Sequence, residues 1–119
     1  LVVKGDLQQS SGVLAMEMLL ARGRPFSAIF AANDQMAFGA RLAMYRRGIR
    51  VPQDISLVGF DDEASAAYMV PPLTTVRQPS VQIGRDAAQA VLALIRGESL
   101  DLPLYKAELT IRESVTRQR

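Results

Sequence analysis

Short apolar runs alternate with longer segments of helical periodicity along this chain, and no other sequence feature restricts its fold as strongly. Residues 28–31 and 55–60 are apolar runs too short for helices, so we expect two buried strands there. Residues 11–22, 34–47 and 81–96 have helical spacing, and each is followed by a glycine, as is common where helices end. This order predicts an α/β fold in which helices flank a parallel sheet.

Three further segments are expected to be strands. They are residues 1–3, residues 74–76 and residues 104–112, the last because apolar and polar residues alternate in it. Helix N-termini favour Ser and Asp, whose side chains accept hydrogen bonds from backbone N–H groups that have no partner within the helix. The expected caps are Ser10 or Ser11 for the first helix, Asp34 for the second and Ser80 for the third.

The composition is that of a globular domain, with 49% apolar and 22% charged residues among 119. Every apolar run is shorter than the ~18 residues that span a bilayer, so we expect no membrane contact. The chain contains no cysteine, which excludes disulfides and thiolate metal sites and agrees with a cytoplasmic location. It starts at Leu1 rather than Met, so we expect a piece of a longer protein.

A net charge of +2 and an isoelectric point near 9.4 raise the question of nucleic-acid binding. Arg46, Arg47 and Arg50 lie near the end of one expected helix, where the helix dipole favours cations. No aromatic stacking platform accompanies these arginines. We therefore interpret them as solvated surface charge.

The residue types give little support to catalysis. The chain has no histidine, the commonest general base, and no Gly-x-Ser-x-Gly elbow or glycine-rich phosphate loop. The acidic triplet at residues 61–63 could hold a divalent metal or accept a phosphoryl group, as in response-regulator receivers. A receiver also needs an acidic pair after its first strand and a late lysine, whereas Asp6 is alone there and Lys106 lies inside the last expected strand. We expect no enzyme, no cofactor and no metal site.

Polar residues follow the expected parallel strands at their carboxyl ends, where open α/β sheets bind ligands. Asn33 follows residues 28–31, Asp61 follows residues 55–60, and Leu7 lies just past the first strand. The Asp61 carboxylate can accept hydrogen bonds from sugar hydroxyls, and the Asn33 amide offers both a donor and an acceptor. Alternatively, each could serve a turn, a role for which Asp62 and Asp34 are also available.

The helix expected at residues 34–47 carries two apolar stripes. The stripe expected on the sheet contains Met36, Ala37, Ala40 and Met44. The second contains Phe38, Leu42 and Tyr45. Because a surface helix needs one buried face, the second stripe predicts a cover, which we expect to be another subunit. The alternative is packing under the loop at residues 68–72.

Five sequence segments resemble the LacI/GalR family of transcriptional repressors, in the order and spacing of that family. They are KGD at 4–6, ANDQMA at 32–37, VPQDISLVGFDD at 51–62, PPLTTV at 71–76 and ELTIRES at 108–114. The resemblance implies a periplasmic-binding-protein-like type I core of two lobes, with a small sugar-like effector in the cleft between them. It implies that residues 1–76 belong to the C-terminal lobe, 77–103 to a crossover and a helix of the N-terminal lobe, and 104–119 to a returning strand and tail.

The resemblance also assigns roles to single residues. Asp61 matches the family's effector-contacting aspartate, Asn33 matches a position that faces the cleft, and Gln78 lies at the crossover, where it could reach the ligand or only cover the surface. Leu7 stands where several relatives carry an aromatic residue. Leucine offers apolar contact without a π-face, which makes a purine less favoured and leaves sugars and sugar acids open.

The family's dimer interface uses the helix at 34–47, the segment after the first strand and the stretch at 65–70, so the resemblance adds Tyr68, Met69 and Val70 to the expected homodimer surface. It implies DNA binding only through a headpiece upstream of this chain. The alternative function is a periplasmic sugar-binding receptor of a transport system, a monomer of the same architecture. The second apolar stripe favours the regulator, because a monomeric receptor has no need of it.

Overall fold

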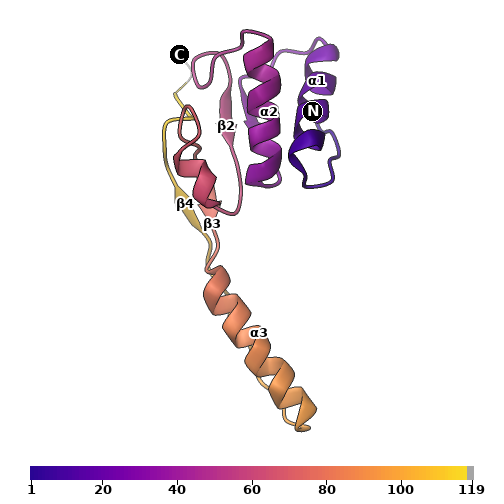
Figure 1. The fold of residues 1–119 in the computed structure, drawn as a ribbon, viewed down its shortest axis with the longest axis vertical. Coiled ribbons are helices and arrows are strands. Elements are labelled where there is room, and N and C mark those ends of the chain that lie inside the picture. Colours follow the sequence, from indigo (N-terminus) through magenta and orange to yellow (C-terminus); the bar gives the residue numbers. More distant parts are fainter. Residues whose placement is uncertain (118–119) are drawn as a thin grey trace.

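The computed structural model describes residues 1–117 as a compact part from which a long arm extends (Figure 1). In chain order the elements are α1 (Gln9–Ala21), β1 (Ala28–Phe30), α2 (Asp34–Arg46), β2 (Ser56–Val58), the short 3₁₀ helix η1 (Ala64–Ala67), β3 (Thr75–Arg77), α3 (Ser80–Ile95) and β4 (Glu108–Thr110). The compact part comprises residues 1–77 and 108–117, and the arm comprises residues 78–107. The chain measures 57 × 25 × 23 Å.

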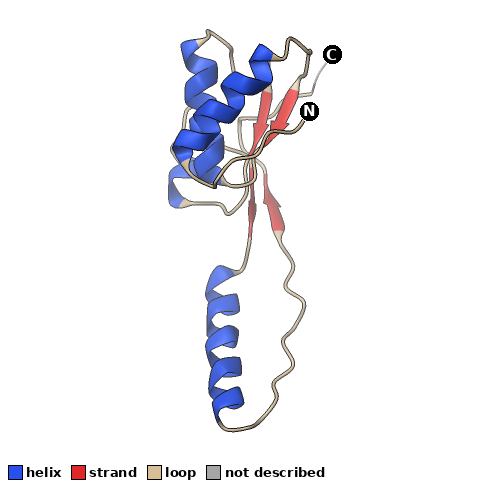
Figure 2. Ribbon diagram, turned by 90° about the vertical axis from the view of Figure 1, so that its right-hand side faces the viewer, coloured by secondary structure: helices blue, strands red, loops and turns tan. Residues whose placement is uncertain are grey.

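The elongation has a clear structural origin. The radius of gyration is 17.6 Å, whereas a compact chain of this length has one of about 13.5 Å. Helix α3 leads away from the compact part, and residues 98–107 return as a loop (Figure 2). The arm therefore lies outside the core that the rest of the chain forms.

The sheet is built around a parallel pair of strands, as the sequence predicts. Strands β1 and β2 pair in parallel with Ile29 opposite Leu57. Strand β3 continues beside β2 through a parallel bridge between Val58 and Thr74, and it pairs in an antiparallel manner with β4. This arrangement confirms the α/β fold with a parallel sheet and helices, and it places the carboxyl ends of β1, β2 and β3 toward the arm (Figure 1).

Helices α1 and α2 pack side by side through glycines (Figure 1). A Cβ atom on Gly39 would lie 1.9 Å from the carbonyl oxygen of Gln9, and one on Gly12 would lie 2.2 Å from the carbonyl oxygen of Met36. No side chain fits at such distances, because both neighbours are backbone atoms. The two glycines therefore allow the helix backbones to touch.

The core lies between these helices, the sheet and the segment that follows η1. Its fully buried side chains include Met16, Met44, Leu57 and Leu73. The stripe predicted to face the sheet is buried as expected: Met36, Ala37, Ala40 and Met44 are at most 8% exposed. Helical periodicity thus identified the packed face of α2 correctly.

The first expected strand is absent. Residues 1–3 form no strand, and an apolar cavity of about 760 Å³ lies between this segment and β1. Without a neighbour within hydrogen-bonding reach, an extended segment forms no ladder. The same cavity explains why β1 is less buried than predicted, with Phe30 65% exposed.

The ends of other elements also differ from the sequence predictions. Helix α1 starts after Gln8, α2 is capped by Asn33, and α3 starts after Pro79, so the expected caps Ser10, Ser11, Asp34 and Ser80 are wrong. Local propensity identifies a helix start only to within a few residues. The last strand, predicted over 104–112, covers only Glu108–Thr110, because residues 104–107 run along the arm beyond the end of β3.

The arm has almost no core of its own. Among its described residues Ala93 is the one that is buried, while five large apolar side chains of α3 are exposed: Val81, Val91, Leu92, Leu94 and Ile95. The Tyr105 hydroxyl donates a hydrogen bond to Asp86 Oδ2 at 2.8 Å and so ties the returning segment to α3. Within residues 1–117, no helix combines the length and apolar character needed to cross a bilayer.

Candidate functional site

Asn33 and Leu7 meet at the carboxyl end of β1. Asn33 Oδ1 accepts a hydrogen bond from the Met36 N–H at 2.9 Å, and Asn33 Nδ2 donates one to the Leu7 carbonyl oxygen at 2.9 Å. Asn33 is therefore the side chain that caps α2, the turn role that was the alternative to ligand binding. The same side chain fixes Leu7, which has a φ of 67° and an exposed side chain, at the rim of this edge.

Asp61 and Gln78 meet at the same edge, beyond the ends of β2 and β3. The Asp61 N–H donates to the Val76 carbonyl oxygen at 2.9 Å, which fixes the backbone of the turn. The exposed carboxylate accepts a hydrogen bond from Gln78 Nε2 at 3.0 Å through Oδ1. The four residues that the sequence predicted as ligand contacts thus lie in two pairs along one sheet edge, and Asp61 presents a carboxylate to solvent.

Asp34 joins the two pairs beneath the surface, a role that the sequence did not indicate. Its N–H donates to the Phe60 carbonyl oxygen at 2.8 Å. Its fully buried carboxylate accepts hydrogen bonds from Thr75 Oγ1 at 2.6 Å and from the Glu63 N–H at 2.8 Å. Burial raises the pKa of Asp34, and the two hydrogen bonds oppose that rise. Asp34 therefore connects α2 with β3 and with the turn that carries Asp61.

Asp62 is held by two arginines, which the sequence also did not indicate. Its Oδ1 accepts from Arg112 Nη2 and its Oδ2 from Arg77 Nε, both at 2.6 Å. Burial alone would raise the pKa of Asp62, but the hydrogen bonds and charges of Arg112 and Arg77 outweigh burial and lower it. Asp62 is thus an ionised, enclosed carboxylate, unlike the exposed one of Asp61.

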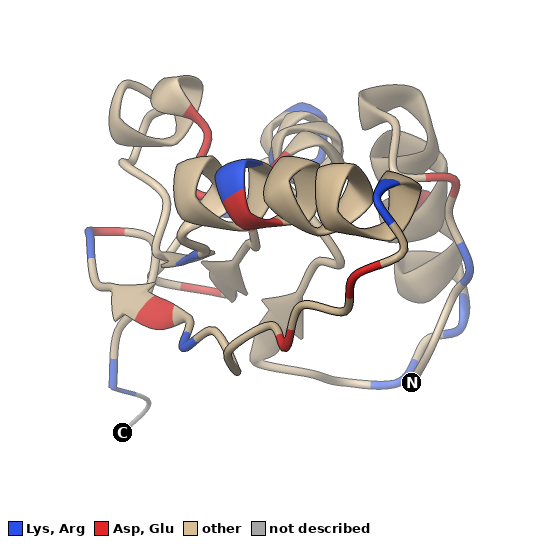
Figure 3. Cartoon of the chain, turned by 90° about the horizontal axis from the view of Figure 1, so that it is seen from below, with Lys and Arg blue, Asp and Glu red and all other residues tan. Residues whose placement is uncertain are grey.

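These interactions leave the acidic triplet without the arrangement that a metal needs. Asp62 is bound to arginines, and Glu63 Oε2 accepts a hydrogen bond from Gln35 Nε2 at 2.5 Å. Across the described residues, no three acidic, histidine or cysteine side chains are grouped so that they could hold a metal ion. Acidic and basic positions are interspersed over the compact part, and neither sign dominates the view from below (Figure 3).

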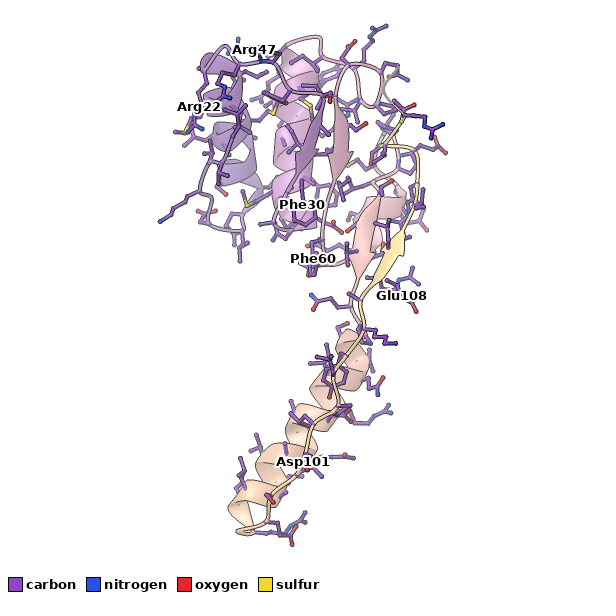
Figure 4. All side chains as sticks on the ribbon, turned by 180° about the vertical axis from the view of Figure 1, so that it is seen from behind. Arg22, Phe30, Arg47, Phe60, Asp101 and Glu108 are labelled. Carbon is purple, nitrogen blue, oxygen red and sulfur yellow. The ribbon has the colours of Figure 1, made fainter. Side chains whose placement is uncertain are left out.

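Aromatic side chains lie near the edge as well. Phe30 and Phe60 come from the carboxyl ends of neighbouring strands and point out at the end of the compact part nearest the arm (Figure 4). Phe30 is largely exposed and Phe60 is half-buried. Sequence reasoning assigned both residues to buried strands and so missed that they supply apolar surface beside Asn33 and Asp61.

The predicted interface residues gather on a second face, formed by α2 and η1. Phe38 and Met69 pack partly against the core, which agrees in part with the intramolecular alternative. The remaining four are exposed: Leu42 by 37%, Tyr45 by 71%, Val70 by 78% and Tyr68 by 85%. Arg41 lies among them, with its Nε donating to the Val70 carbonyl oxygen at 2.9 Å and its guanidinium carbon 5.9 Å from the centre of the Tyr45 ring.

Comparison with known proteins agrees with this geometry. The family model of the periplasmic binding protein-like domain matches residues 2–115. The probable HTH-type transcriptional repressor ExuR of Bacillus subtilis (strain 168) is 42% identical over 120 residues, which cover 97% of this chain and 35% of the relative.

Two solved structures have the same fold. One is the transcriptional regulator CelR in complex with cellobiose, with a TM-score of 0.86 and 39% identity over 92% of this chain and 34% of that chain. The other is the lac repressor dimer bound to operator and an anti-inducer, with a TM-score of 0.86 and 34% identity over 95% of this chain and 40% of that chain.

The chain therefore belongs to the periplasmic binding protein-like domain family, in the form that LacI-type transcriptional regulators carry. The resemblance to the LacI/GalR repressors is thereby confirmed. The chain spans about a third of the length of the curated relatives that it matches.

Proposed function

We propose that this chain is the effector-sensing and dimerising portion of a transcriptional regulator, and that the carboxyl edge of its sheet binds a sugar or sugar derivative. The exposed Asp61 carboxylate, held beside the Gln78 amide, is the observation that carries the proposal. A carboxylate accepts hydrogen bonds from two hydroxyls, and an adjacent amide can donate to a third oxygen. Asn33 and Leu7, fixed together on the same edge, would flank the ligand.

The relatives support this assignment. ExuR, AscG and CelR are named as regulators of transcription, and CelR has been solved with cellobiose bound. Because these similar proteins are regulators of transcription, we prefer the regulator to the periplasmic sugar-binding receptor. A regulator would act in the cytoplasm and read DNA through a headpiece upstream of the present residues. Ligand binding without catalysis is the activity that we assign.

The arm suggests how the chain divides between lobes. We propose that residues 1–76 belong to the C-terminal lobe, that residues 77–103 cross over and supply a helix to the N-terminal lobe, and that residues 104–119 return. Exposed apolar side chains on α3 need a cover that the described residues do not provide. The cavity beside β1 likewise suits further chain from the same lobe, since β1 pairs with β2 on its other edge.

The ligand role of Asp61 is tested in the full-length protein by thermal shift and calorimetry with cellobiose, ribose, galacturonate and hypoxanthine as probes. We expect at least one of the three sugars to bind and hypoxanthine not to bind. Asp61→Ala should lower the affinity for that sugar at least ~30-fold, because it removes an acceptor of charge-assisted hydrogen bonds. Asp54→Ala is the matched control: Asp54 is also exposed, but it pairs with Arg50 far from the edge. Unchanged affinity in Asp61→Ala would refute the assignment.

The second face is proposed to form a homodimer through Phe38, Leu42, Tyr45, Tyr68, Met69 and Val70. A second copy of the same face would bury the four exposed members of this set. Leu42→Glu should convert the full-length dimer to a monomer in sedimentation velocity, because a charge would be buried without a partner. Leu14→Glu is the control, since Leu14 is an exposed leucine on α1. A dimer that survives Leu42→Glu would place the interface elsewhere.

A further inference from the structure

The turn that presents Asp61 has an unfavourable backbone. Asp61 has a φ of 110° and Asp62 a φ of 54°, so two consecutive residues with side chains occupy the positive-φ region that favours glycine. Such backbone conformations persist only where surrounding contacts hold them. The backbone of Asp61 is held by the hydrogen bond from its N–H to the Val76 carbonyl oxygen, and its exposed carboxylate adds a hydrogen bond from Gln78.

Asp62 supplies the strong anchor. Its side chain is 5% exposed, and each carboxylate oxygen binds a different arginine. Arg77 is the last residue of β3, and Arg112 follows β4 by two residues. Arg112 also donates from Nη1 to the Leu73 carbonyl oxygen at 2.8 Å, and its own N–H donates to Thr74 Oγ1 at 2.9 Å. One carboxylate therefore ties the turn to both chain segments that connect the compact part with the arm.

Other ion pairs of the described residues differ from this one. Arg50 and Asp54 form an exposed pair four residues apart within one loop. Arg47 and Glu17 join α2 to α1 within the compact part. By contrast, Asp62 reaches 15 residues along the chain to Arg77 and 50 residues to Arg112, and both partners lead to the arm.

We infer that Asp62 is a positioning residue of the ligand site, which holds Asp61 in its presenting conformation and makes that conformation depend on the two connecting strands. The inference rests on the proposed ligand role of Asp61. A change in the direction of β3 and β4 relative to β1, β2 and α2 displaces Arg77 and Arg112. Because both arginines bind Asp62, that displacement also moves Asp62 and the neighbouring Asp61. By reciprocity, a ligand that fixes Asp61 favours one direction of the strands, and with it one orientation of the lobe that contains α3.

The strand coupling is tested without any ligand by pulsed electron–electron double resonance on the full-length protein. Spin labels are placed at Arg46→Cys, near the end of α2, and Glu98→Cys, just past α3, in a background without other reactive cysteines. Asp62→Asn keeps the size of the side chain but removes its charge, and we expect it to broaden the distance distribution at least twofold. Asp54→Asn, which removes the charge of the surface pair, should leave the width unchanged. An unchanged width in Asp62→Asn would overturn the inference.

Hydrogen exchange separates positioning from general destabilisation. In Asp62→Asn, the exchange rates of the Asp61 and Asp62 amides should increase by a factor at least ten times larger than that of the Leu57 amide. The Leu57 amide donates to the Ser114 carbonyl oxygen in the core. Equal acceleration at all three amides would show that Asp62 only stabilises the fold, and it would overturn the inference. In the spin-label experiment, Arg112→Lys should give a distance distribution of a width between those of the unaltered protein and Asp62→Asn. Lysine keeps the charge but lacks the second N–H group that reaches Leu73.

The two proposals fail in different ways. If Asp61→Ala keeps its sugar affinity, the ligand role fails, while the label distances still report whether Asp62 holds the strands. If the ligand role holds, Asp62→Asn should lower the affinity for the same sugar three- to tenfold, because Asp61 is then presented only part of the time. A sugar affinity equal to that of the unaltered protein, with labels broadened as expected, would overturn the link between Asp62 and the site.

Discussion

The compact part and the arm are built from helices of similar length, yet they differ in what covers their apolar faces. In the compact part, α1 and α2 touch through backbone at Gly12 and Gly39, and every large apolar residue on the inner face of α2 is buried. In the arm, α3 has open space around Gly84, and its apolar side chains are exposed along most of its length. The contact between α1 and α2 is complete within the described residues, whereas the apolar face of α3 needs other chain to cover it.

The difference shows what periodicity can predict. Apolar residues at helical spacing indicate that a face is covered, and they do so for α2 and α3 alike. What covers the face depends on contacts far along the chain, which a local pattern does not contain. The glycines of the compact part and the exposed leucines of the arm are the residues at which this comparison can be tested.

The largest effect is expected at the contact between α1 and α2. Gly39→Ala places a methyl group 1.9 Å from the Gln9 carbonyl oxygen and 2.7 Å from the Val13 nitrogen, so α1 has to move away. Overpacking against backbone should lower the free energy of unfolding of the full-length protein by about 3 kcal/mol. Urea denaturation followed by circular dichroism measures it. A loss below about 1 kcal/mol would show that the helices separate easily and that the compact part is looser than its packing indicates.

Much of the fold was predictable because its signals are local. The three long helices and strands β1, β2 and β3 follow from apolar runs, helical spacing and closing glycines, and each lies within a few residues of its predicted position. The absence of a first strand was not predictable, because residues 1–3 are apolar, as in a buried strand, and yet have no neighbouring strand to pair with. The caps were not predictable either. At α2, Asn33 and Asp34 are adjacent and either could serve, whereas α1 and α3 begin after Gln8 and Pro79, whose side chains form no capping hydrogen bond.

The site was predictable to the same extent. Parallel strands bring their carboxyl ends to one edge, which is why Asn33 and Asp61 were expected together with Leu7. The roles of Asp34 and Asp62 were not accessible, because Thr75 is 41 residues from Asp34 and Arg112 is 50 residues from Asp62. A sequence shows that charges of opposite sign exist, but only the pairing of β3 with β4 and its position beside β2 bring Arg77 and Arg112 to Asp62.

The arm's need for a cover gives the second effect. Leu94 is 67% exposed in the present chain, so if nothing covered it, Leu94→Ala would change stability by less than about 0.5 kcal/mol. If the rest of the protein packs on α3, the same substitution in the full-length protein should cost about 2 kcal/mol, as for a buried leucine. Leu14→Ala on the exposed side of α1 serves as the control. Equally small losses of stability in Leu94→Ala and Leu14→Ala would show that the rest of the protein does not pack on α3 at Leu94.

A third, smaller effect concerns the junction between the two regions and depends on pH. The pKa of Asp62 is lowered from its ordinary value of 3.8, so the unfolded chain takes up a proton before the folded one does. The stability that the ionised Asp62 contributes is therefore fully present well above the ordinary pKa of 3.8, and it is lost as pH falls through that value toward the folded pKa. Because this loss requires the Asp62 carboxylate, Asp62→Asn should lose less free energy of unfolding than the unaltered protein between pH 5 and pH 3 in urea denaturation. If both proteins lose the same free energy of unfolding between pH 5 and pH 3, the arginines do not lower the pKa of Asp62 in the folded state.

The smallest expected effect reverses the sign of the first and completes the comparison. Gly84 lies inside α3 with no atom within 4 Å of the place where a Cβ would be. Gly84→Ala should therefore raise the free energy of unfolding by about 0.5–1 kcal/mol, because alanine loses less backbone entropy in a helix than glycine does. The same glycine-to-alanine change would then stabilise the arm and destabilise the compact part, with urea midpoints as the measure in both cases. A destabilising Gly84→Ala in the full-length protein would mean that the covering lobe approaches the backbone of α3 at this position, as α1 approaches α2 at Gly39.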